Sequence, residues 1–98
     1  MPFKLNVSKV KSVPDSISAV VSAENISGNY AAAEIEIKAF NSEGKVIGKS
    51  VNKLSLKSGK RTDINVSVMT REKADKIVMS VWDTDKNNLY EERVIFGK

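Results

Sequence analysis

The feature that most constrains this chain is a recurring alternation of apolar and polar residues. It is clearest in residues 31–39, where Ala and Ile on one side face Glu and Lys on the other, and in residues 62–68. A period of two residues is that of a β-strand with one buried face. Turns rich in Gly, Asn, Ser and Lys break the pattern at intervals of about 8–12 residues. The sequence therefore predicts an all-β fold, an antiparallel immunoglobulin-like β-sandwich of about seven strands.

The expected strands follow from the apolar runs between turns. They cover residues 3–13, 17–24, 31–40, 45–51, 62–68 and 77–82, with a last strand that contains Tyr90, Val94 and Phe96. In the first strand the alternation slips at Val10, which predicts a bulge. Leu54 and Leu56 are expected to bridge two strands, and residues 71–74 to form one helical turn. The predicted core consists of inward-facing residues: Leu5, Val7, Ala19, Val21, Ile35, Ile37, Leu56, Ile64, Val66, Val68, Ile77, Met79 and Val81.

Length and composition limit the class of protein. The 98 residues suit one domain, residues 1–98, and 41% hydrophobic with 29% charged residues describe a globular chain. No apolar run approaches the roughly 20 residues that cross a bilayer, and the N-terminus lacks the apolar core of a signal peptide. We therefore expect no membrane insertion. Two locations follow: a module of a longer extracellular or cell-surface protein, or, alternatively, a cytoplasmic protein.

Two missing residue types bear on catalysis. The chain has no cysteine and no histidine. It therefore lacks thiol nucleophiles, thiolate metal sites and the commonest general base. The remaining acidic, lysine and hydroxyl side chains show no catalytic spacing. The sequence predicts a domain that is not an enzyme, with no cofactor and no metal.

The basic residues are densest between Lys45 and Arg61, in a chain of net charge +4. Gly44, Gly48 and the β-branched residues near them argue against a helix here. These lysines are therefore expected on an exposed edge strand and its loop, where charge prevents edge-to-edge aggregation. A nucleic-acid site would need basic residues gathered on one face with aromatic residues between them. We expect no nucleic-acid partner.

Four segments, taken in order, resemble a bacterial family. Residues 19–28, AVVSAENISG, resemble its vxaxvxNxsg strand and turn, and residues 37–46, IKAFNSEGKV, its valYdsdGkv hairpin. Residues 56–59 and 78–83 are similar to its lxpGe turn and vkaFlWds strand. These patterns belong to immunoglobulin-like or fibronectin-III-like accessory domains, of the FxLYD style, in Gram-positive secreted and cell-surface proteins. The resemblance implies a non-catalytic module that acts as a spacer, scaffold or weak binder.

Trp82 and Tyr90 are candidates for a ligand-stacking platform. If the strands on either side of the turn pair, the two rings are expected near each other at one end of an outer sheet face. Asp83, Asp85 and Asn87 of that turn are expected to supply hydrogen bonds to a ligand. Aromatic rings suit a sugar because its C–H face packs on a ring while its hydroxyls need polar partners. The alternative is that both rings cover the sheet end or pack on a neighbouring domain.

Phe40 is expected on the same outer face, at a distance from Trp82. Antiparallel pairing of the third and sixth strands places Phe40 beside the start of the sixth strand. The separation is then about 20 Å, at 3.3 Å per residue. We therefore expect no continuous aromatic shelf.

The turn after Trp82 also has the beginning of a calcium-loop pattern. Asp83, Asp85 and Asn87 match the first three ligand positions of an EF-hand loop, but its sixth and twelfth positions hold Asn and Val instead of Gly and Glu. The EF-hand match therefore fails. A looser calcium site built from Asp83, Asp85 and Glu91 stays open, beside the simpler interpretation of a solvated hairpin turn.

The sequence favours a non-catalytic accessory module of a secreted or surface protein. Its expected partners are neighbouring domains of a longer chain, with a polysaccharide or a protein surface as a further ligand. The alternative is a small free-standing protein that captures partners, or assembles with itself, by adding a strand to an exposed sheet edge.

Overall fold

The computed structural model describes residues 1–95, which form seven β-strands and no helix. The strands are β1 (Phe3–Val13), β2 (Ser16–Asn25), β3 (Ala31–Phe40), β4 (Val46–Leu56), β5 (Arg61–Met69), β6 (Lys76–Trp82) and β7 (Asn88–Ile95). Every paired set of strands is antiparallel. The all-β class predicted from the alternation is confirmed.

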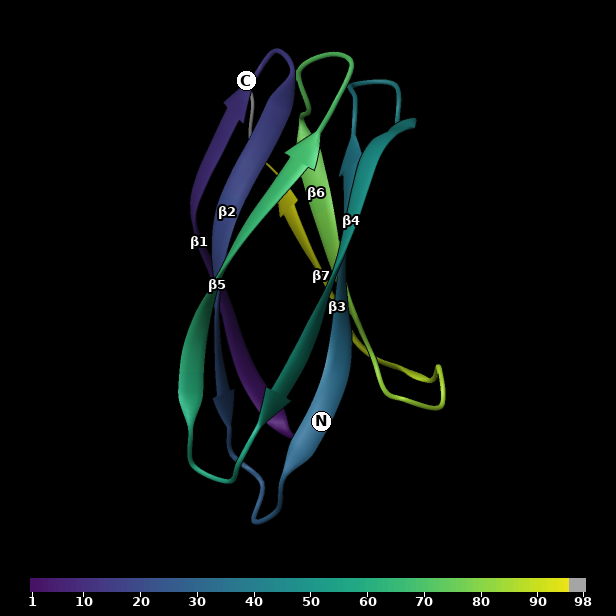
Figure 1. Cartoon of the computed structure of the whole chain (residues 1–98). Coiled ribbons are helices and arrows are strands. Elements are labelled where there is room, and N and C mark those ends of the chain that lie inside the picture. Colours follow the sequence, from purple (N-terminus) through teal and green to yellow (C-terminus); the bar gives the residue numbers. More distant parts are fainter. Residues whose placement is uncertain (96–98) are drawn as a thin grey trace.

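The strands form two sheets that face each other (Figure 1). The three-stranded sheet has the order β1-β2-β5, and the four-stranded sheet the order β4-β3-β6-β7. Hairpins join β1 to β2, β3 to β4 and β6 to β7, while the other connections cross between sheets. This arrangement is the predicted immunoglobulin-like sandwich, with one inner and one outer face for each sheet.

Side chains from both inner faces fill the space between the sheets. Val21 from the three-stranded sheet and Ile35, Met79 and Val81 from the four-stranded sheet have no exposed surface. Some predicted core residues are only partly buried: Leu5, Val7, Leu56 and Ile64. They lie on β1, β4 and β5, which are edge strands of their sheets. An edge strand has a neighbour on one side only, so its inward side chains are covered less completely.

The fourth strand is longer than the sequence predicts. β4 pairs with β3 from Val46 to Leu56, with a register shift near its start. Leu54 and Leu56 are therefore strand residues rather than a bridge between strands. Leu54 is buried in the core. β4 forms one edge of its sheet, as expected from its lysines.

The predicted helical turn at residues 71–74 is wrong. This connection between the sheets is irregular, and it is fixed by contacts to other segments. The Asp75 amide donates to the Phe40 carbonyl over 2.9 Å, and the Ser12 hydroxyl donates to the Ala74 carbonyl over 3.2 Å. Ala74 is fully buried. Packing against the core, rather than the hydrogen bonds of a helix, therefore holds this segment.

The predicted bulge in β1 is confirmed. Its register with β2 shifts between Ser8 and Lys11, and Lys9 has a φ of 53°. At the other end of the chain, β7 includes Tyr90 and Val94 as predicted. Phe96, also expected in this strand, lies outside the described residues. Over residues 1–95, no helix has the length and apolar content that a membrane crossing requires.

Candidate functional site

Trp82 projects from the outer face of the four-stranded sheet. It is the last residue of β6, and the preceding Val81 points into the core. Successive side chains of a strand point to opposite faces, so the indole faces outward. Trp82 pairs with Glu34 on β3, and Glu34 pairs with Lys53 on β4. The three side chains therefore form a row across the sheet.

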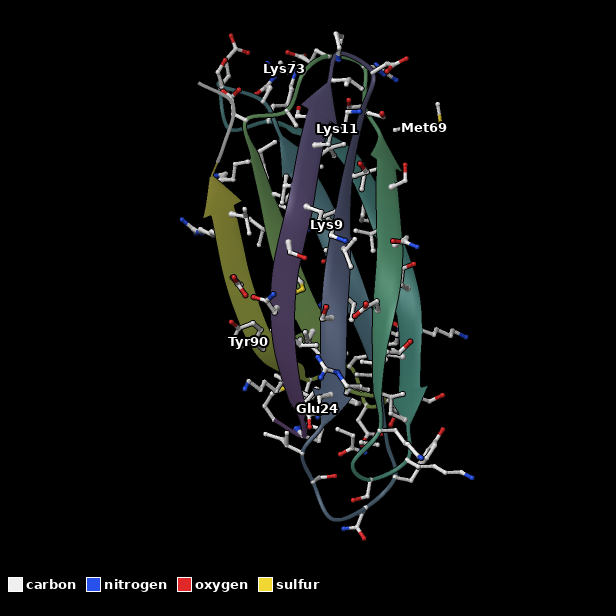
Figure 2. All side chains as sticks on the ribbon, turned by 90° about the vertical axis from the view of Figure 1, so that its left-hand side faces the viewer. Lys9, Lys11, Glu24, Met69, Lys73 and Tyr90 are labelled. Carbon is white, nitrogen blue, oxygen red and sulfur yellow. The ribbon has the colours of Figure 1, made fainter. Side chains whose placement is uncertain are left out.

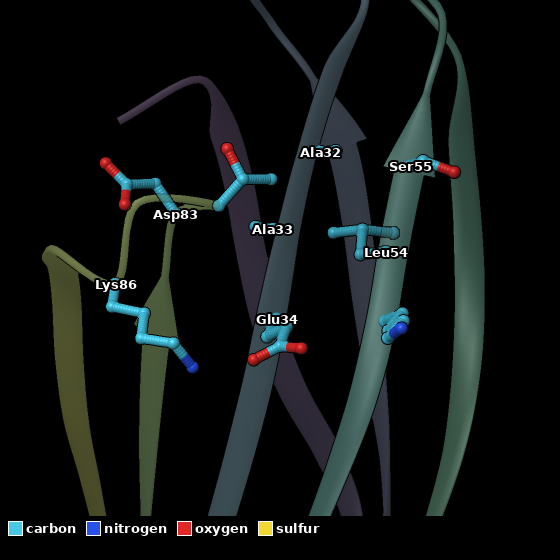
Figure 3. Close-up of a pocket in the computed structure, with 9 residues that line it drawn as sticks. Ala32, Ala33, Glu34, Leu54, Ser55, Asp83 and Lys86 are labelled. Carbon is cyan, nitrogen blue, oxygen red and sulfur yellow. The ribbon is translucent and has the colours of Figure 1, made fainter.

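Two hollows adjoin this row. The larger, of about 290 Å³, lies over β3 and β4 beside the β6–β7 turn (Figure 3), and its lining includes Ala32, Glu34, Lys53 and Lys86. The smaller, of about 230 Å³, is lined by Glu34, Glu36, Trp82 and Lys86. Glu34 and Lys86 belong to both. The small side chain of Ala32 leaves room on the sheet surface next to a bulky ring and several charged groups.

The Asp83 carboxylate forms hydrogen bonds within the turn that follows Trp82. Its Oδ1 accepts hydrogen bonds from the amides of Asp85 and Asn87, at 2.9 and 2.8 Å. Its Oδ2 accepts one from Asn87 Nδ2 at 3.1 Å. These hydrogen bonds, first of all the one from the Asn87 amide, hold the pKa of Asp83 below its ordinary value. Asp83 and Asn87 thus build the turn that was expected to offer them to a ligand.

The β3–β4 turn uses the same design. Asn41 Oδ1 accepts from the amides of Glu43 and Lys45, at 2.9 and 3.0 Å, which are again the second and fourth residues beyond it. In that turn the residue before Lys45 is Gly44, with a φ of 79°. The matching residue of the β6–β7 turn is Lys86, with a φ of 65°. A left-handed conformation is strained for a residue with a side chain and free for glycine.

Tyr90 does not join Trp82, which corrects the predicted platform. Tyr90 pairs with Val81, and Trp82 pairs with Asn88 across a bulge. Tyr90 is therefore on the core-facing side of the sheet, at the β7 edge (Figure 2), while Trp82 faces outward. The Asp83 amide donates to the Asn87 carbonyl over 2.9 Å, which closes the hairpin with Asn88 opposite Trp82. The bulge that follows, with one extra residue in β7, turns Tyr90 to the other face.

The tyrosine makes a local contact instead. Its hydroxyl donates to Glu92 Oε1 at 2.9 Å, and this hydrogen bond raises the pKa of Tyr90. Residues 90 and 92 share one side of β7, as the period of a strand requires. Tyr90 is 38% exposed, so it is a surface residue of the sandwich edge.

The looser calcium site receives no support from the geometry. Among residues 1–95, no three acidic side chains gather into a group that could hold a metal ion. Asp85 contributes its amide to the turn, and Glu91 lies further along β7, opposite Ser80. The solvated hairpin turn is the interpretation that fits.

The two glutamates beside Trp82 lie among lysine side chains. Glu34 and Glu36 are two residues apart on the same side of β3. The ammonium groups of Lys38 and Lys49 lie 4.0 and 3.9 Å from the Glu36 carboxylate. The arrangement offers hydrogen-bond acceptors and donors to a ligand on the sheet surface.

Phe40 lies where the sequence predicts. It pairs with Lys76 at the start of β6, and the Lys76 ammonium is 4.8 Å from the ring centroid. Glu34, opposite Trp82, is six residues away along β3. That separation corresponds to about 20 Å. The aromatic residues of this face are therefore two separate features.

The edges formed by β1 and β4 are less suited to a ligand. β1 is interrupted by its bulge, and β4 exposes Lys49 and Lys53. Both devices oppose pairing with a further strand. Gly48 brings β4 against β5: a Cβ at this position would lie 2.5 Å from the Met69 carbonyl oxygen. The outer face around Trp82 is the better candidate site.

Sequence reasoning missed Glu34, Lys53 and Lys86 as members of this site. The first two carry a usable signal, because the outward residues of β3 and β4 are read from the alternation once the strand order is known. Lys86 has no such signal. The turn sequence does not reveal that Lys86 has a positive φ; the structure does.

No protein-family model matches this sequence, and no curated protein matches it. Solved structures do match its fold. One is a β-glucuronidase from glycoside hydrolase family 2, with a TM-score of 0.65, 12% identity and coverage of 96% of this chain and 11% of that chain. Another is a calcium-binding mutant of Bacteroides uniformis β-glucuronidase 2, with a TM-score of 0.72, 10% identity and coverage of 96% and 13%.

A third similar structure is covered over almost its whole length. A FixG-related protein from Vibrio parahaemolyticus aligns with a TM-score of 0.62 and 13% identity over 100% of this chain and 99% of that chain. At such identities the likeness shows the fold alone. The sandwich thus resembles a small part of long glycosidase chains, and also nearly the whole of one short solved chain.

Proposed function

We propose that this sandwich is a non-catalytic accessory module that binds a polysaccharide weakly through the outer face around Trp82. The observation that carries the proposal is the row formed by Trp82, Glu34 and Lys53 beside two hollows. An indole that is partly exposed on a sheet supports stacking of a sugar ring, and the charged side chains beside it offer partners for hydroxyls. Tyr90 has no part in this site.

The setting we propose is a secreted or cell-surface protein of a Gram-positive bacterium, with neighbouring domains of the same chain as partners. Two observations support it. The fold is similar to a segment that makes up 11–13% of β-glucuronidase chains. The four sequence segments from residue 19 to residue 83 resemble FxLYD-style accessory domains. A module of this kind serves as spacer or scaffold and adds binding through avidity.

The affinity of one module is expected to be low. A single indole with a few hydrogen bonds corresponds to about 4–8 kcal/mol, or millimolar to micromolar binding. Such binding becomes useful when several modules, or a module and a catalytic domain, engage one polymer together.

A polysaccharide pull-down tests the proposal. Wild-type protein is mixed with insoluble cellulose, xylan and mannan, and the bound fraction is measured beside Trp82→Ala and Tyr90→Ala. We expect Trp82→Ala to lose retention and Tyr90→Ala to keep it, because the two rings project from opposite faces of the sheet. Far-ultraviolet circular dichroism verifies that both variants fold. Equal retention of wild type and Trp82→Ala, or retention of neither, would leave the module a spacer.

A further inference from the structure

Lys86 occupies a position that the fold reserves for glycine elsewhere. The turns at Asn41 and Asp83 have the same hydrogen bonds to the second and fourth residues beyond them. The third residue is Gly44 in one turn and Lys86 in the other, with φ of 79° and 65°. The strain of a lysine in this region is of order 1 kcal/mol or more. Lys9 also has a positive φ, and there the bulge of β1 accounts for it. Strain of this kind also gathers at functional sites, so the surroundings of Lys86 decide whether its side chain has a role.

The side chain of Lys86 extends over the candidate site. It lines both hollows, and Figure 3 shows it reaching from the turn toward Glu34 along the sheet. No ion pair within 4.0 Å joins Lys86 and Glu34 in the described part of the chain. The two side chains line the same hollow beside Trp82 without forming an ion pair with each other. One is a donor of hydrogen bonds and the other an acceptor.

The charges around the larger hollow cancel. Lys53 and Lys86 contribute two positive charges, and Glu34 and Asp83 two negative charges. In the smaller hollow, which Trp82 lines, Lys86 faces Glu34 and Glu36, and the charge of Glu36 is offset by the ammonium groups of Lys38 and Lys49 at 4.0 and 3.9 Å. A ligand with a net charge of either sign would meet like charges at close range, together with the desolvation of its own charge. A neutral ligand that carries both donors and acceptors meets neither penalty. Sugar hydroxyls have this property, because each one donates and accepts.

We infer that Lys86 and Glu34 bind two neighbouring hydroxyls of a neutral sugar unit stacked on Trp82, and that Lys86 is kept in a strained turn for this contact. The ammonium donates to one hydroxyl, and the carboxylate accepts from the next. The inference rests on the proposed function and adds to it the class of ligand, a neutral polysaccharide with adjacent hydroxyls.

The single tryptophan of the chain provides the measurement. Emission of Trp82 is followed during titration with cellohexaose, xylohexaose and mannohexaose, then with the hexamer of galacturonic acid and a chitosan hexamer. We expect at least one neutral hexamer to bind more tightly than both charged ones. Lys86→Gly and Glu34→Gln are expected to weaken that binding by about tenfold, since each removes one charged hydrogen bond. Lys45→Ala, in the turn at the opposite end, is expected to bind like the wild type.

Thermal unfolding separates binding from stability. Glycine relieves the strained φ, so Lys86→Gly should have a higher Tm than the wild type while its affinity falls. A lower Tm for Lys86→Gly would overturn the inferred strain, and with it the inference. Tighter binding of the uronate or chitosan hexamer would overturn the ligand class.

Two further results distinguish this inference from the proposed function. If Lys86→Gly and Glu34→Gln bind like the wild type and only Trp82→Ala loses binding, the proposed function stands and the inference fails. If no hexamer changes the emission of Trp82 and no polysaccharide retains the protein, both fail together.

Discussion

Asparagine and aspartate end three strands of this sandwich and hold the chain in the turns that follow. Asn41 and Asp83 each accept two amide hydrogen bonds. Asn25, 1% exposed, is more deeply placed: its Nδ2 donates to the carbonyls of Asn29 and Leu56, both at 2.8 Å. Its Oδ1 accepts from the Ser27 amide and hydroxyl, at 2.9 and 2.7 Å. The buried amide thus ties two neighbouring loops together.

Removal of the Asn25 amide should destabilise the fold. In Asn25→Ala, the carbonyls of Asn29 and Leu56 and the Ser27 amide lose their partner at a buried position, and we expect a loss of about 2–4 kcal/mol in the free energy of unfolding. Chemical denaturation followed by circular dichroism measures it. Asn65→Ala on the exposed face of β5 is the control, with an expected change within about 0.5 kcal/mol. Similar values for both variants would contradict a structural role of Asn25.

Asp83 should give the domain an acid-sensitive component of stability. Its pKa is lowered in the folded state, so its contribution is fully present above the unfolded value of about 3.9 and is lost as pH falls through the lower folded value. Asp83→Asn keeps an acceptor for the turn and removes the titration. We expect its Tm to fall less than that of the wild type between pH 6 and pH 2. Asp85→Asn, which removes the same formal charge from the same turn, should behave like the wild type. A wild-type pH profile for Asp83→Asn would refute this role.

At the scale of elements, the close approach of β4 and β5 closes one side of the sandwich. Gly48 permits it, because a Cβ there would lie 2.5 Å from the Met69 carbonyl oxygen and 2.6 Å from Val68 Cγ1. Backbone atoms cannot move aside as a flexible side chain can. The glycine is therefore required by the contact between two strands rather than by its own backbone angle.

Gly48→Ala should separate these strands and destabilise the protein. Overpacking of this kind lowers the free energy of unfolding by about 1–3 kcal/mol. Gly28→Ala is the matched control, since nothing lies within 4 Å of a Cβ at that position. Denaturant midpoints of the two variants provide the measurement, and a Gly48→Ala midpoint equal to that of Gly28→Ala would exclude the proposed contact.

Register explains why the aromatic platform predicted from sequence is wrong. The turn places Asn88 opposite Trp82, and this register alone would leave Tyr90, two residues further along β7, on the same face as Trp82. The bulge between this pair and the Val81–Tyr90 pair adds one residue to β7, and because side chains alternate between faces, it moves Tyr90 to the other side of the sheet. The site around Trp82 is completed by β3, β4 and the turn, through Glu34, Lys53 and Lys86.

For the whole molecule, the two outer faces differ in what they offer a ligand. The three-stranded sheet presents small polar residues on β2 and β5, such as Ser18, Ser22, Asn65 and Ser67, and a smaller hollow of about 160 Å³ lined in part by Lys4, Glu24 and Arg61. The four-stranded sheet combines the only tryptophan with paired and unpaired charges and two hollows. Binding through one face leaves the other face, both ends and the edges available for contacts with neighbouring domains.

The alternation of apolar and polar residues was enough to predict the sandwich, the inner faces, the β1 bulge and the place of Phe40. These properties depend on local geometry: a period of two decides which face a residue takes, and Asn, Asp and Gly mark where a strand ends. The alternation could not predict that Leu5 and Ile64 are only partly buried, because their burial depends on which strands form the edges of the sheets. Strand order is a property of pairing between distant segments, which the alternation does not specify.

The sequence by itself determined that this chain folds as a β-sandwich and, for β2, β3, β5 and β6, which side chains point outward. Only the tertiary structure decided which outward residues meet. Glu34, Lys53 and Trp82 form one row because β3 pairs with both β4 and β6, and Lys86 reaches them because its turn holds it at a positive φ. The physical reason is that alternation is a short-range consequence of strand geometry, whereas register and turn conformation are set by hydrogen bonds between residues far apart or by the closure of one hairpin.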